Sequence, residues 1–253
     1  MNKTKIDWAD YTWNPVTGCY HGCKYCYARR IVRRFGRKNY ELSIDKKNRI
    51  LTSPKNIIGG YKGPYPWGFN STLHKYRLDE PQKLKKPSNI FVSSMGDLFG
   101  EWVPDYWIQK VFEACQKAPW HRYMFLTKNP GRYVELAKKG LLVNEPNYWY
   151  GSTATNSRMS RFIKPKCDAT KYNTFISIEP ILQPWDVNPY GEFESIQWVI
   201  IGAETGNRKG KVIPEKEWIM AIKKACERTG TPLFMKESLK EIMGQDFIQE
   251  FPW

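Results

Sequence analysis

The chain of 253 residues is long enough for one large domain or two small ones, so the size of its hydrophobic core does not limit stability. Lys and Arg number 40 against 25 Asp and Glu, and the net charge of +15 favours polyanionic partners such as nucleic acid. The sequence has no apolar run near the ~18 residues that cross a bilayer and no apolar signal-peptide core after Met1, so we expect a cytoplasmic protein with no membrane partner.

Three of the six cysteines, Cys19, Cys23 and Cys26, lie in one short segment. In a reducing compartment, clustered thiols are better explained as metal ligands than as disulfides. A structural zinc site needs four ligands, commonly two pairs, and the other cysteines are isolated in the sequence. Two metal-binding interpretations remain, beside a third in which the cysteines are incidental to a non-catalytic scaffold. The thiolates hold an iron-sulfur cluster with one iron open to a small molecule, or they form, with His21 or a distant residue, a structural zinc site on a basic nucleic-acid-binding module.

After the cysteines, the spacing predicts a helix over residues 27–37. Tyr27, Ile31 and Phe35 recur at helical intervals, with arginines on the other faces, so this helix should have a basic surface. Residues 39–88 then interrupt the pattern with a stretch rich in glycine and aromatic residues, too long for an ordinary connection. We expect an insertion that covers the active site as a lid, or an excursion packed against the fold.

The rest of the chain alternates short apolar runs with longer amphipathic stretches, which indicates strands alternating with helices. Strands that are apolar throughout predict a parallel sheet buried on both faces, hence an α/β fold. The predicted strands are 89–94, 123–127, 147–153, 174–178, 198–202 and 232–235, with a helix at 106–117.

Polar residues follow several of these strands at the carboxyl end, where ligands gather in parallel α/β folds and barrels. One such residue alone is usually a turn or cap residue. Their recurrence predicts that they surround one common site. They are Asp97, Lys128, Ser152, Thr153, Asn156, Glu179 and Glu204.

The spacing C-x3-C-x2-C, with Tyr25 just before the third cysteine, resembles the cluster-binding motif of the radical S-adenosylmethionine (radical SAM) superfamily. Within that superfamily, the chain is most similar to a family of phage-associated and bacterial proteins of unassigned function. The segments that carry this likeness are Trp13–Cys19, Phe91–Phe99, Leu126–Lys128 and Ile178–Pro180. The resemblance implies a partial (β/α) barrel with parallel strands, formed by residues 1–253 as a single domain, with a first strand over residues 12–16.

The resemblance also implies that the clustered cysteines hold three irons of a 4Fe-4S cluster and that the fourth iron binds S-adenosylmethionine. A reductant such as flavodoxin or ferredoxin would supply the electron that cleaves this cofactor to a 5'-deoxyadenosyl radical. Residues 95–97 resemble the Gly-Gly-Glu segment that receives the methionine amino group, and residues 200–204 resemble a later segment near the adenine. The expected cofactor contacts are Tyr25, Met95, Gly96, Asp97, Lys128, Ser152, Thr153, Asn156, Glu179, Gly202 and Glu204.

The substrate is less closely defined by the sequence. The basic and aromatic residues of segment 61–77 suit phosphate contacts combined with base stacking, so we expect a nucleic acid or nucleotide, with a peptide or a small metabolite as alternatives. Cys115 and Cys226 fall at core positions of predicted helices. Cys167, in a polar turn, is the candidate hydrogen-atom donor to a substrate radical.

Overall fold

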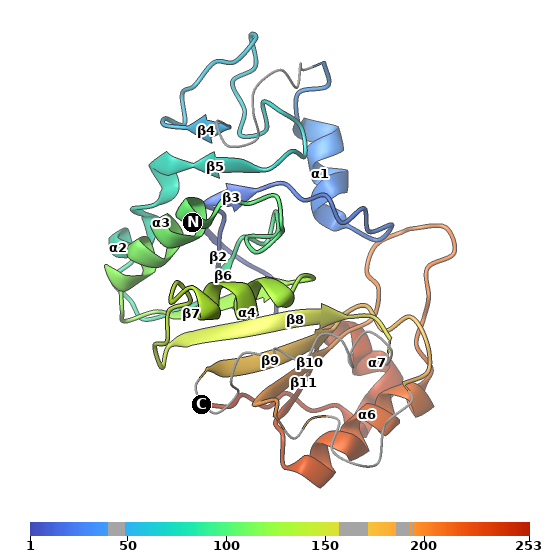
Figure 1. The fold of residues 1–253 in the computed structure, drawn as a ribbon. Helices are drawn as coiled ribbons and strands as arrows, with labels where there is room; N and C mark the ends of the chain where they lie inside the picture. Colours follow the sequence, from blue (N-terminus) through green and yellow to red (C-terminus); the bar gives the residue numbers. More distant parts are fainter. Residues whose placement is uncertain (40–48, 157–171, 186–192, 194) are drawn as a thin grey trace.

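The computed structural model describes residues 1–39, 49–156, 172–185, 193 and 195–253, and it has a mixed α/β fold (Figure 1). The main sheet has eight strands in the order β1-β2-β6-β7-β8-β9-β10-β11. β1 is antiparallel to β2 and all other neighbours are parallel, so the predicted α/β fold with parallel strands is confirmed. The strands are β1 (Asn2–Lys3), β2 (Tyr11–Trp13), β6 (Asn89–Val92), β7 (Arg122–Thr127), β8 (Tyr148–Ala154), β9 (Asn173–Ile178), β10 (Trp198–Ile201) and β11 (Leu233–Met235).

The sheet curls into a partial barrel whose interior is filled with aromatic side chains. Trp8, in the β1–β2 turn, has its ring 4.8 Å from Phe91 of β6, 6.3 Å from Phe175 of β9 and 6.3 Å from Trp198 of β10. One side chain reaches strands this far apart in the sheet order only because the sheet is curved. The Glu237 N–H, just after β11, also donates to Asp7 Oδ2, which ties the far edge back to the β1–β2 turn.

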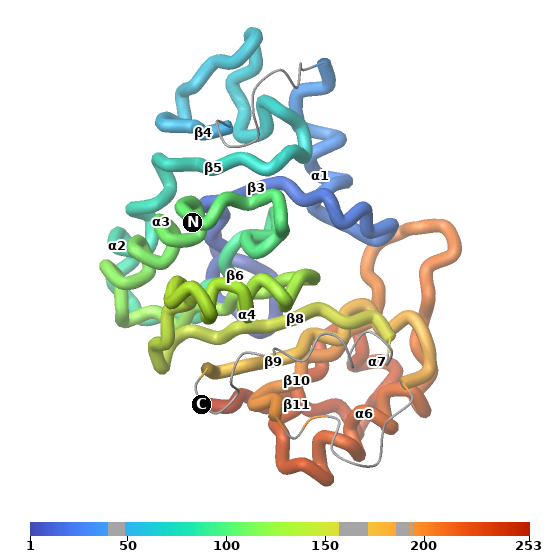
Figure 2. The backbone as a smooth tube through the Cα atoms, viewed as in Figure 1, coloured from blue at the N-terminus to red at the C-terminus, as the bar shows by residue number. Residues whose placement is uncertain are grey.

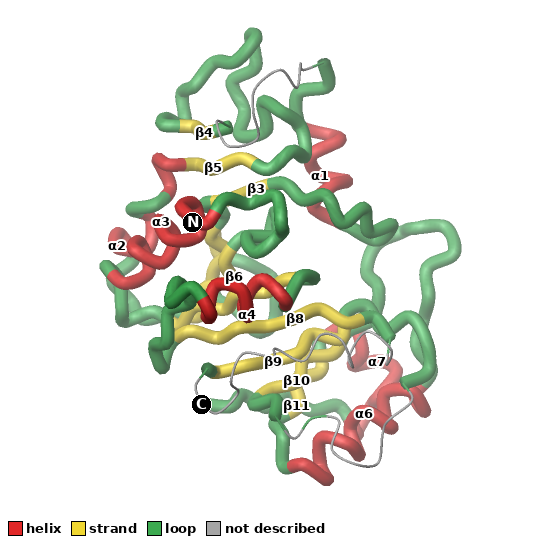
Figure 3. Tube along the Cα trace, in the orientation of Figure 1, coloured by secondary structure: helices red, strands yellow, loops and turns green. Residues whose placement is uncertain are grey.

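Helices cover the outer face of the sheet, and Figure 3 shows them flanking the strands. α3 (Asp105–Gln116) and α4 (Gly131–Lys138) pack on β6, β7 and β8, and α6 (Lys216–Thr229) packs on β9, β10 and β11. Cys115 and Cys226 lie in these two outer core clusters, as predicted. The shorter helical elements are η2 (Lys75–Arg77), α2 (Glu80–Lys83), η3 (Glu237–Leu239), α7 (Lys240–Met243) and η4 (Gly244–Asp246).

A small second sheet lies beside the main one, in the order β3 (Val16–Thr17), β5 (Thr72–His74) and β4 (Ile50–Leu51). Figure 2 traces the chain from this sheet through the barrel to α6. The prediction of one strand over residues 12–16 is therefore wrong, because the chain divides there between two sheets. Pro15 explains the break, since a proline has no N–H to donate to a strand ladder.

The first helix, α1 (Tyr27–Phe35), presents a different face to the core than its apolar spacing suggests. Its buried residues are Ala28 and Val32. Tyr27, Ile31 and Phe35 are 44%, 40% and 60% exposed. The helix ends at Gly36, where a Cβ would lie 2.6 Å from the Val32 carbonyl oxygen.

The other predicted elements lie within one or two residues of their observed bounds. This agreement covers the six later strands and the helix that becomes α3. Among the described residues, no helix combines the length and apolar character needed to cross a membrane.

Candidate active site

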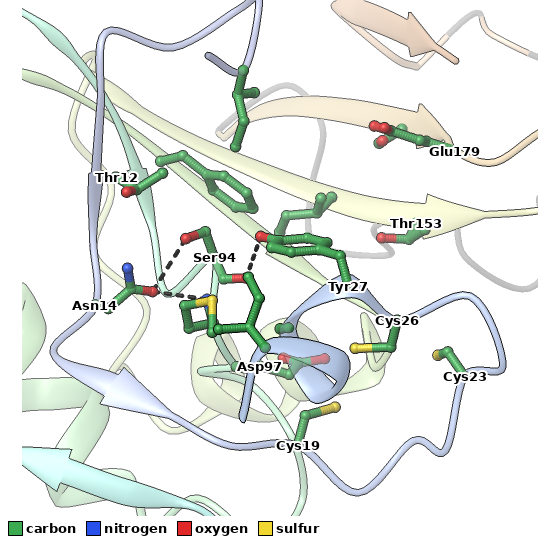
Figure 4. A pocket seen from close by; sticks show the side chains of 18 of the residues that line it. Thr12, Asn14, Cys19, Cys23, Cys26, Tyr27, Ser94, Asp97, Thr153 and Glu179 are labelled. Atoms are coloured by element: carbon green, nitrogen blue, oxygen red, sulfur yellow. Dashed lines mark hydrogen bonds between the residues drawn. The ribbon is translucent and has the colours of Figure 1, made fainter. Parts of the chain in front are cut away.

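A cavity of about 740 Å³ opens at the carboxyl ends of the parallel strands (Figure 4). This volume is typical of ligand pockets. The cysteine loop between β3 and α1 forms one side, and Thr153 and Glu179 lie across from it. The segment predicted as an insertion contributes to the wall through Pro64, Tyr65, Phe69 and Arg77.

The cysteine loop is fixed at its start by close backbone contact with the segment after β6. The Gly18 N–H donates to the Met95 carbonyl at 2.9 Å, and Gly18 pairs with Gly96 as an isolated parallel bridge. Gly18 has φ +89°, and a Cβ there would lie 2.4 Å from the backbone of Asn70. Residue 18 must therefore be glycine, both for its conformation and for the space available.

The end of the loop is the start of α1. Cys26 is the N-cap residue, and its Sγ accepts the Arg29 N–H at 3.3 Å. The Arg29 side chain then reaches back to donate to the Cys19 carbonyl at 3.0 Å. The helix N-terminus and this guanidinium place positive charge beside the loop.

The three thiols line the same cavity and influence one another. Burial, followed by the nearby charges of Asp97 and the other two thiols, raises the pKa of Cys19 to about 12, although the His21 backbone N–H opposes this. Burial also lowers the pKa of Lys128, which the charges of Cys23, Asp97 and Cys19 partly offset. Clustered thiolates in this pocket would therefore be stabilised by a cationic metal centre.

The three thiols lie near one another at one side of the cavity (Figure 4). In the described part of the chain, no three His, Cys, Asp or Glu side chains are close enough to hold a single metal ion. A multi-iron cluster places each thiolate on a different iron, so it does not require such convergence. Cys19, Cys23 and Cys26 are therefore the described residues that could supply thiolates to such a cluster.

Asp97 is held by four donors from the protein itself. Its carboxylate accepts from the Thr127 hydroxyl, from the Phe99 and Lys128 backbone N–H groups, and from His21 Nε2 at 2.8 Å. The His21 ring in turn packs edge-on against Trp102 at 4.9 Å. Asp97 therefore connects the cysteine loop to β7.

The wall across from the thiols is polar. Thr153 of β8 and Ser177 of β9 are partners in adjacent strands, and both line the cavity. Glu179 follows on the same face and pairs with Lys236. The space for this pair depends on Gly202, because a Cβ there would lie 3.0 Å from the Lys236 side chain and 3.4 Å from Glu179.

Glu204 is a buried carboxylate at the rim of the cavity. Arg208 pairs with both of its oxygens, at 2.6 and 2.8 Å. This guanidinium lowers the pKa of Glu204, and its hydrogen bonds are the largest cause. Because Glu204 is paired with Arg208, its negative charge near the end of β10 is neutralised.

The structure brings together most of the residues predicted for this site. Ser152 faces away from the cavity because neighbouring residues of a strand point to opposite faces, and Asn156 and Gly202 are also absent from the lining. Cys167 lies outside the described residues. The predicted residues that do line the cavity are Cys19, Cys23, Cys26, Tyr25, Met95, Gly96, Asp97, Lys128, Thr153, Glu179 and Glu204.

Several lining residues are absent from the sequence prediction. Ser177 lies two residues before Glu179, so the two-residue period of a strand places both on one face. Lys236 directly follows the last strand, which is the signal that identified the other polar residues. Asn14 lines the cavity too, and its Oδ1 accepts from the Met95 N–H at 2.7 Å and from the Ser94 hydroxyl (Figure 4).

Comparison with known proteins places the chain in a family and identifies its fold. No curated protein matches it significantly. Among solved structures, it resembles one mutant of spore photoproduct lyase, a radical SAM enzyme, with 12% identity over 92% of this chain and 78% of that chain and a TM-score of 0.51. A second mutant of that enzyme shows 13% identity over 99% of this chain and 78% of that chain, with a TM-score of 0.48. The similarity to the first of these structures shows a shared fold. The sequence model described as "Protein of unknown function (DUF5131)" matches residues 3–243, so the chain belongs to the DUF5131 family.

Proposed function

We propose that this protein is a radical SAM enzyme that acts on a nucleic acid or nucleotide. Cys19, Cys23 and Cys26 would hold one 4Fe-4S cluster. When bound, this cluster would bind S-adenosylmethionine at its open iron and pass it one electron, giving methionine and a 5'-deoxyadenosyl radical. The observation that carries the proposal is the placement of all three thiols on a cavity at the carboxyl ends of a partial parallel barrel.

The chain's own residues would bind and orient the cofactor. Lys128 brings a positive charge near Cys23 and Cys19 and suits a carboxylate group. The hydroxyls of Thr153 and Ser177 suit ribose oxygens. Asp97 is already held by four protein donors, so its role would be to fix the cysteine loop through His21 rather than to receive an amino group.

The electron would come from a partner protein, because the single expected cluster is the one that binds the cofactor and no second cluster is expected to deliver electrons to it. A flavodoxin or ferredoxin would supply it. The exposed Lys24 stands between Cys23 and Cys26 in the sequence and would be part of the contact.

A structural zinc site is the alternative for the same thiols. One zinc ion needs its ligands about 2.3 Å from a single point. The polar wall across from the thiols supports a catalytic cavity over a closed structural zinc site, because a closed site leaves no open position for a ligand to occupy.

The test is anaerobic reconstitution with iron and sulfide, followed by metal analysis and electron paramagnetic resonance of the reduced protein. We expect about four irons per chain, and a signal that changes when S-adenosylmethionine is added. With a chemical reductant, the protein should form 5'-deoxyadenosine. Stoichiometric zinc with no cluster, and no response to the cofactor, would refute the proposal.

Cys23→Ala is the matched variant. It removes one proposed ligand from an exposed loop, so the protein should stay folded but lose its bound iron. Cys226→Ala removes a thiol from the outer core at α6 and should keep the full iron content. Normal iron in the Cys23 variant would show that this thiol is not a ligand.

A further inference from the structure

Helix α1 presents arginines and apolar side chains together to solvent. Arg30 and Arg34 are four residues apart and so share one side of the helix, directly beside Tyr27 and Ile31. Both arginines are exposed, and the described residues form no ion pair with either. Phe35 continues the apolar stripe and is 60% exposed. Exposed apolar side chains that are grouped on one side of a helix commonly mark an interaction site.

A second basic segment lies beside α1 near the cavity. It is the loop after β10, where Lys209 and Lys211 are exposed. The Arg30 guanidinium lies against Gly206 of this loop, 3.1 Å from where a Cβ would stand. No acidic residue occurs in residues 11–40 or in residues 205–214. We call the exposed cations of the cysteine loop, α1 and the loop after β10 the basic rim: Lys24, Arg30, Arg33, Arg34, Lys209 and Lys211.

The basic rim is continuous with the cavity of the candidate active site. Tyr27 and Ile31 line that cavity, and so does Thr205 in the loop after β10. A ligand held by the rim would therefore have part of its structure next to the thiols. The cations lie where they would position a ligand, and the cavity lies where chemistry on it would occur.

We propose that the basic rim binds single-stranded nucleic acid, with phosphates on the rim cations, bases stacked on the exposed stripe of α1, and one nucleotide entering the cavity. Arginine provides charge for phosphates and a planar face for bases, and aromatic side chains stack with bases of any sequence. A base inside a duplex could not reach the cavity without leaving its stack, so a single strand is the favoured form. This inference specifies the substrate of the proposed radical SAM function.

Anionic membranes also attract basic amphipathic helices, but the geometry favours a strand. α1 has nine residues, and its apolar stripe leads into a cavity instead of lying along a plane. The second group of cations lies on a separate segment, which contacts α1 through Arg30 and Gly206. Cations on two segments beside a cavity fit a narrow chain that leads into it.

Fluorescence anisotropy with a labelled 16-nucleotide single strand tests the proposal, using DNA and RNA of the same mixed sequence and a DNA duplex. We expect the single strand to bind more tightly than the duplex. Affinity should fall as salt rises, with a log–log slope of about −0.7 for each phosphate contact. Arg30→Glu/Arg34→Glu should weaken binding at least ~10-fold and make the slope shallower by about 1.4, the value for two lost contacts.

A matched control reverses the same charges at the same spacing on another helix. Lys224 and Arg228 are exposed on α6, also four residues apart, so Lys224→Glu/Arg228→Glu changes net charge equally. This control should weaken binding less than about 3-fold if the rim is the site. Phe35→Ala should weaken binding about 5-fold or more with an unchanged salt slope, because it removes stacking and no charge. Circular dichroism checks folding, and Arg30→Gln/Arg34→Gln replaces the reversal if that variant is unfolded.

Three outcomes would overturn the inference. They are equal losses in the α1 and α6 variants, tighter binding of the duplex, or binding to phosphatidylglycerol vesicles without binding to the oligonucleotide. Binding needs neither cluster nor cofactor, and iron content is measured on the same samples. Oligonucleotide binding without iron would count against the proposed chemistry alone, and iron without binding would count against this substrate alone.

Discussion

Two polar side chains at strand ends, Asp97 and Ser177, illustrate opposite uses of a buried polar group. Asp97 accepts from four protein donors and so stabilises the fold. The Ser177 hydroxyl is buried at 1% exposure, lines the cavity and has no hydrogen-bond partner among the described residues. Burying a hydroxyl without a partner costs about 1–3 kcal/mol, so its retention beside a cavity points to a ligand as the missing partner.

Ser177→Ala should therefore weaken cofactor binding without weakening the fold. The KM for S-adenosylmethionine should rise about 3- to 10-fold, the usual value of one hydrogen bond. The free energy of unfolding should stay the same or increase, because an unsatisfied hydroxyl is removed. Initial rates of 5'-deoxyadenosine formation and urea unfolding measure the two quantities.

The control for this variant is Ser71→Ala. The Ser71 hydroxyl is buried and unpartnered among the described residues, but it is not part of the cavity lining. Its removal should leave the KM unchanged. An unchanged KM in Ser177→Ala as well, or a loss of stability there, would show that Ser177 serves packing alone.

At the scale of elements, strand β8 shows how the barrel interior is filled. Its residues alternate between the two faces, so Trp149, Gly151 and Thr153 face the interior. The glycine is required by its neighbour, since a Cβ at Gly151 would lie 2.2 Å from the Phe175 ring. The packing of the aromatic side chains beneath the cavity thus requires a glycine at position 151.

Gly151→Ala should lower the free energy of unfolding by about 1–3 kcal/mol, because the added methyl group overpacks a rigid interior. Gly131→Ala is the control, in the first turn of α4. The nearest atom to a Cβ there is 3.8 Å away, so the substitution should be neutral or stabilising by up to ~1 kcal/mol through helix propensity. Equal effects of both substitutions in urea unfolding would contradict this account of the interior.

The sequence allowed the later strands to be predicted closely, because runs of buried residues such as Trp198–Ile201 leave a local signal. It did not show which of Ser152 and Thr153 points into the cavity, because this depends on how the strand is aligned with its neighbours in the sheet. It also missed the division at Pro15, where β2 and β3 join different sheets. The exposed stripe of α1 was unpredictable for the same reason: spacing shows that residues share a face, and tertiary contacts decide whether that face is buried.

At the scale of the whole molecule, the net charge of +15 includes paired and unpaired cations. The cations of the basic rim form no ion pair among the described residues, while others are paired, as in the exposed pair of Lys83 with Asp79. Buried titratable groups also respond to pH. The histidines His74 and His121 are both buried, and burial lowers the pKa of each below its ordinary value.

This arrangement predicts that the protein loses stability on mild acidification. The folded state binds protons on these histidines less tightly than the unfolded chain does, so the unfolded state gains protons first as the pH falls. The free energy of unfolding should decrease below about pH 6.5, by up to ~1.4 kcal/mol per pH unit for each histidine. Urea unfolding at pH 7.5, 6.5 and 5.5 measures this slope.

His74→Gln isolates the contribution of one histidine. In the small sheet, His74 Nε2 lies 2.9 Å from the Thr17 hydroxyl, and a glutamine amide can keep a hydrogen bond there without titrating. The variant should lose about half of the pH dependence between 6.5 and 5.5, with the remainder due to His121. Glu204 acts in the same direction, but Arg208 lowers its pKa below the ordinary 4.5, so it titrates outside this window. An unchanged slope in His74→Gln would mean that His74 binds protons equally well in the folded and unfolded states, so that its burial does not disfavour the protonated ring.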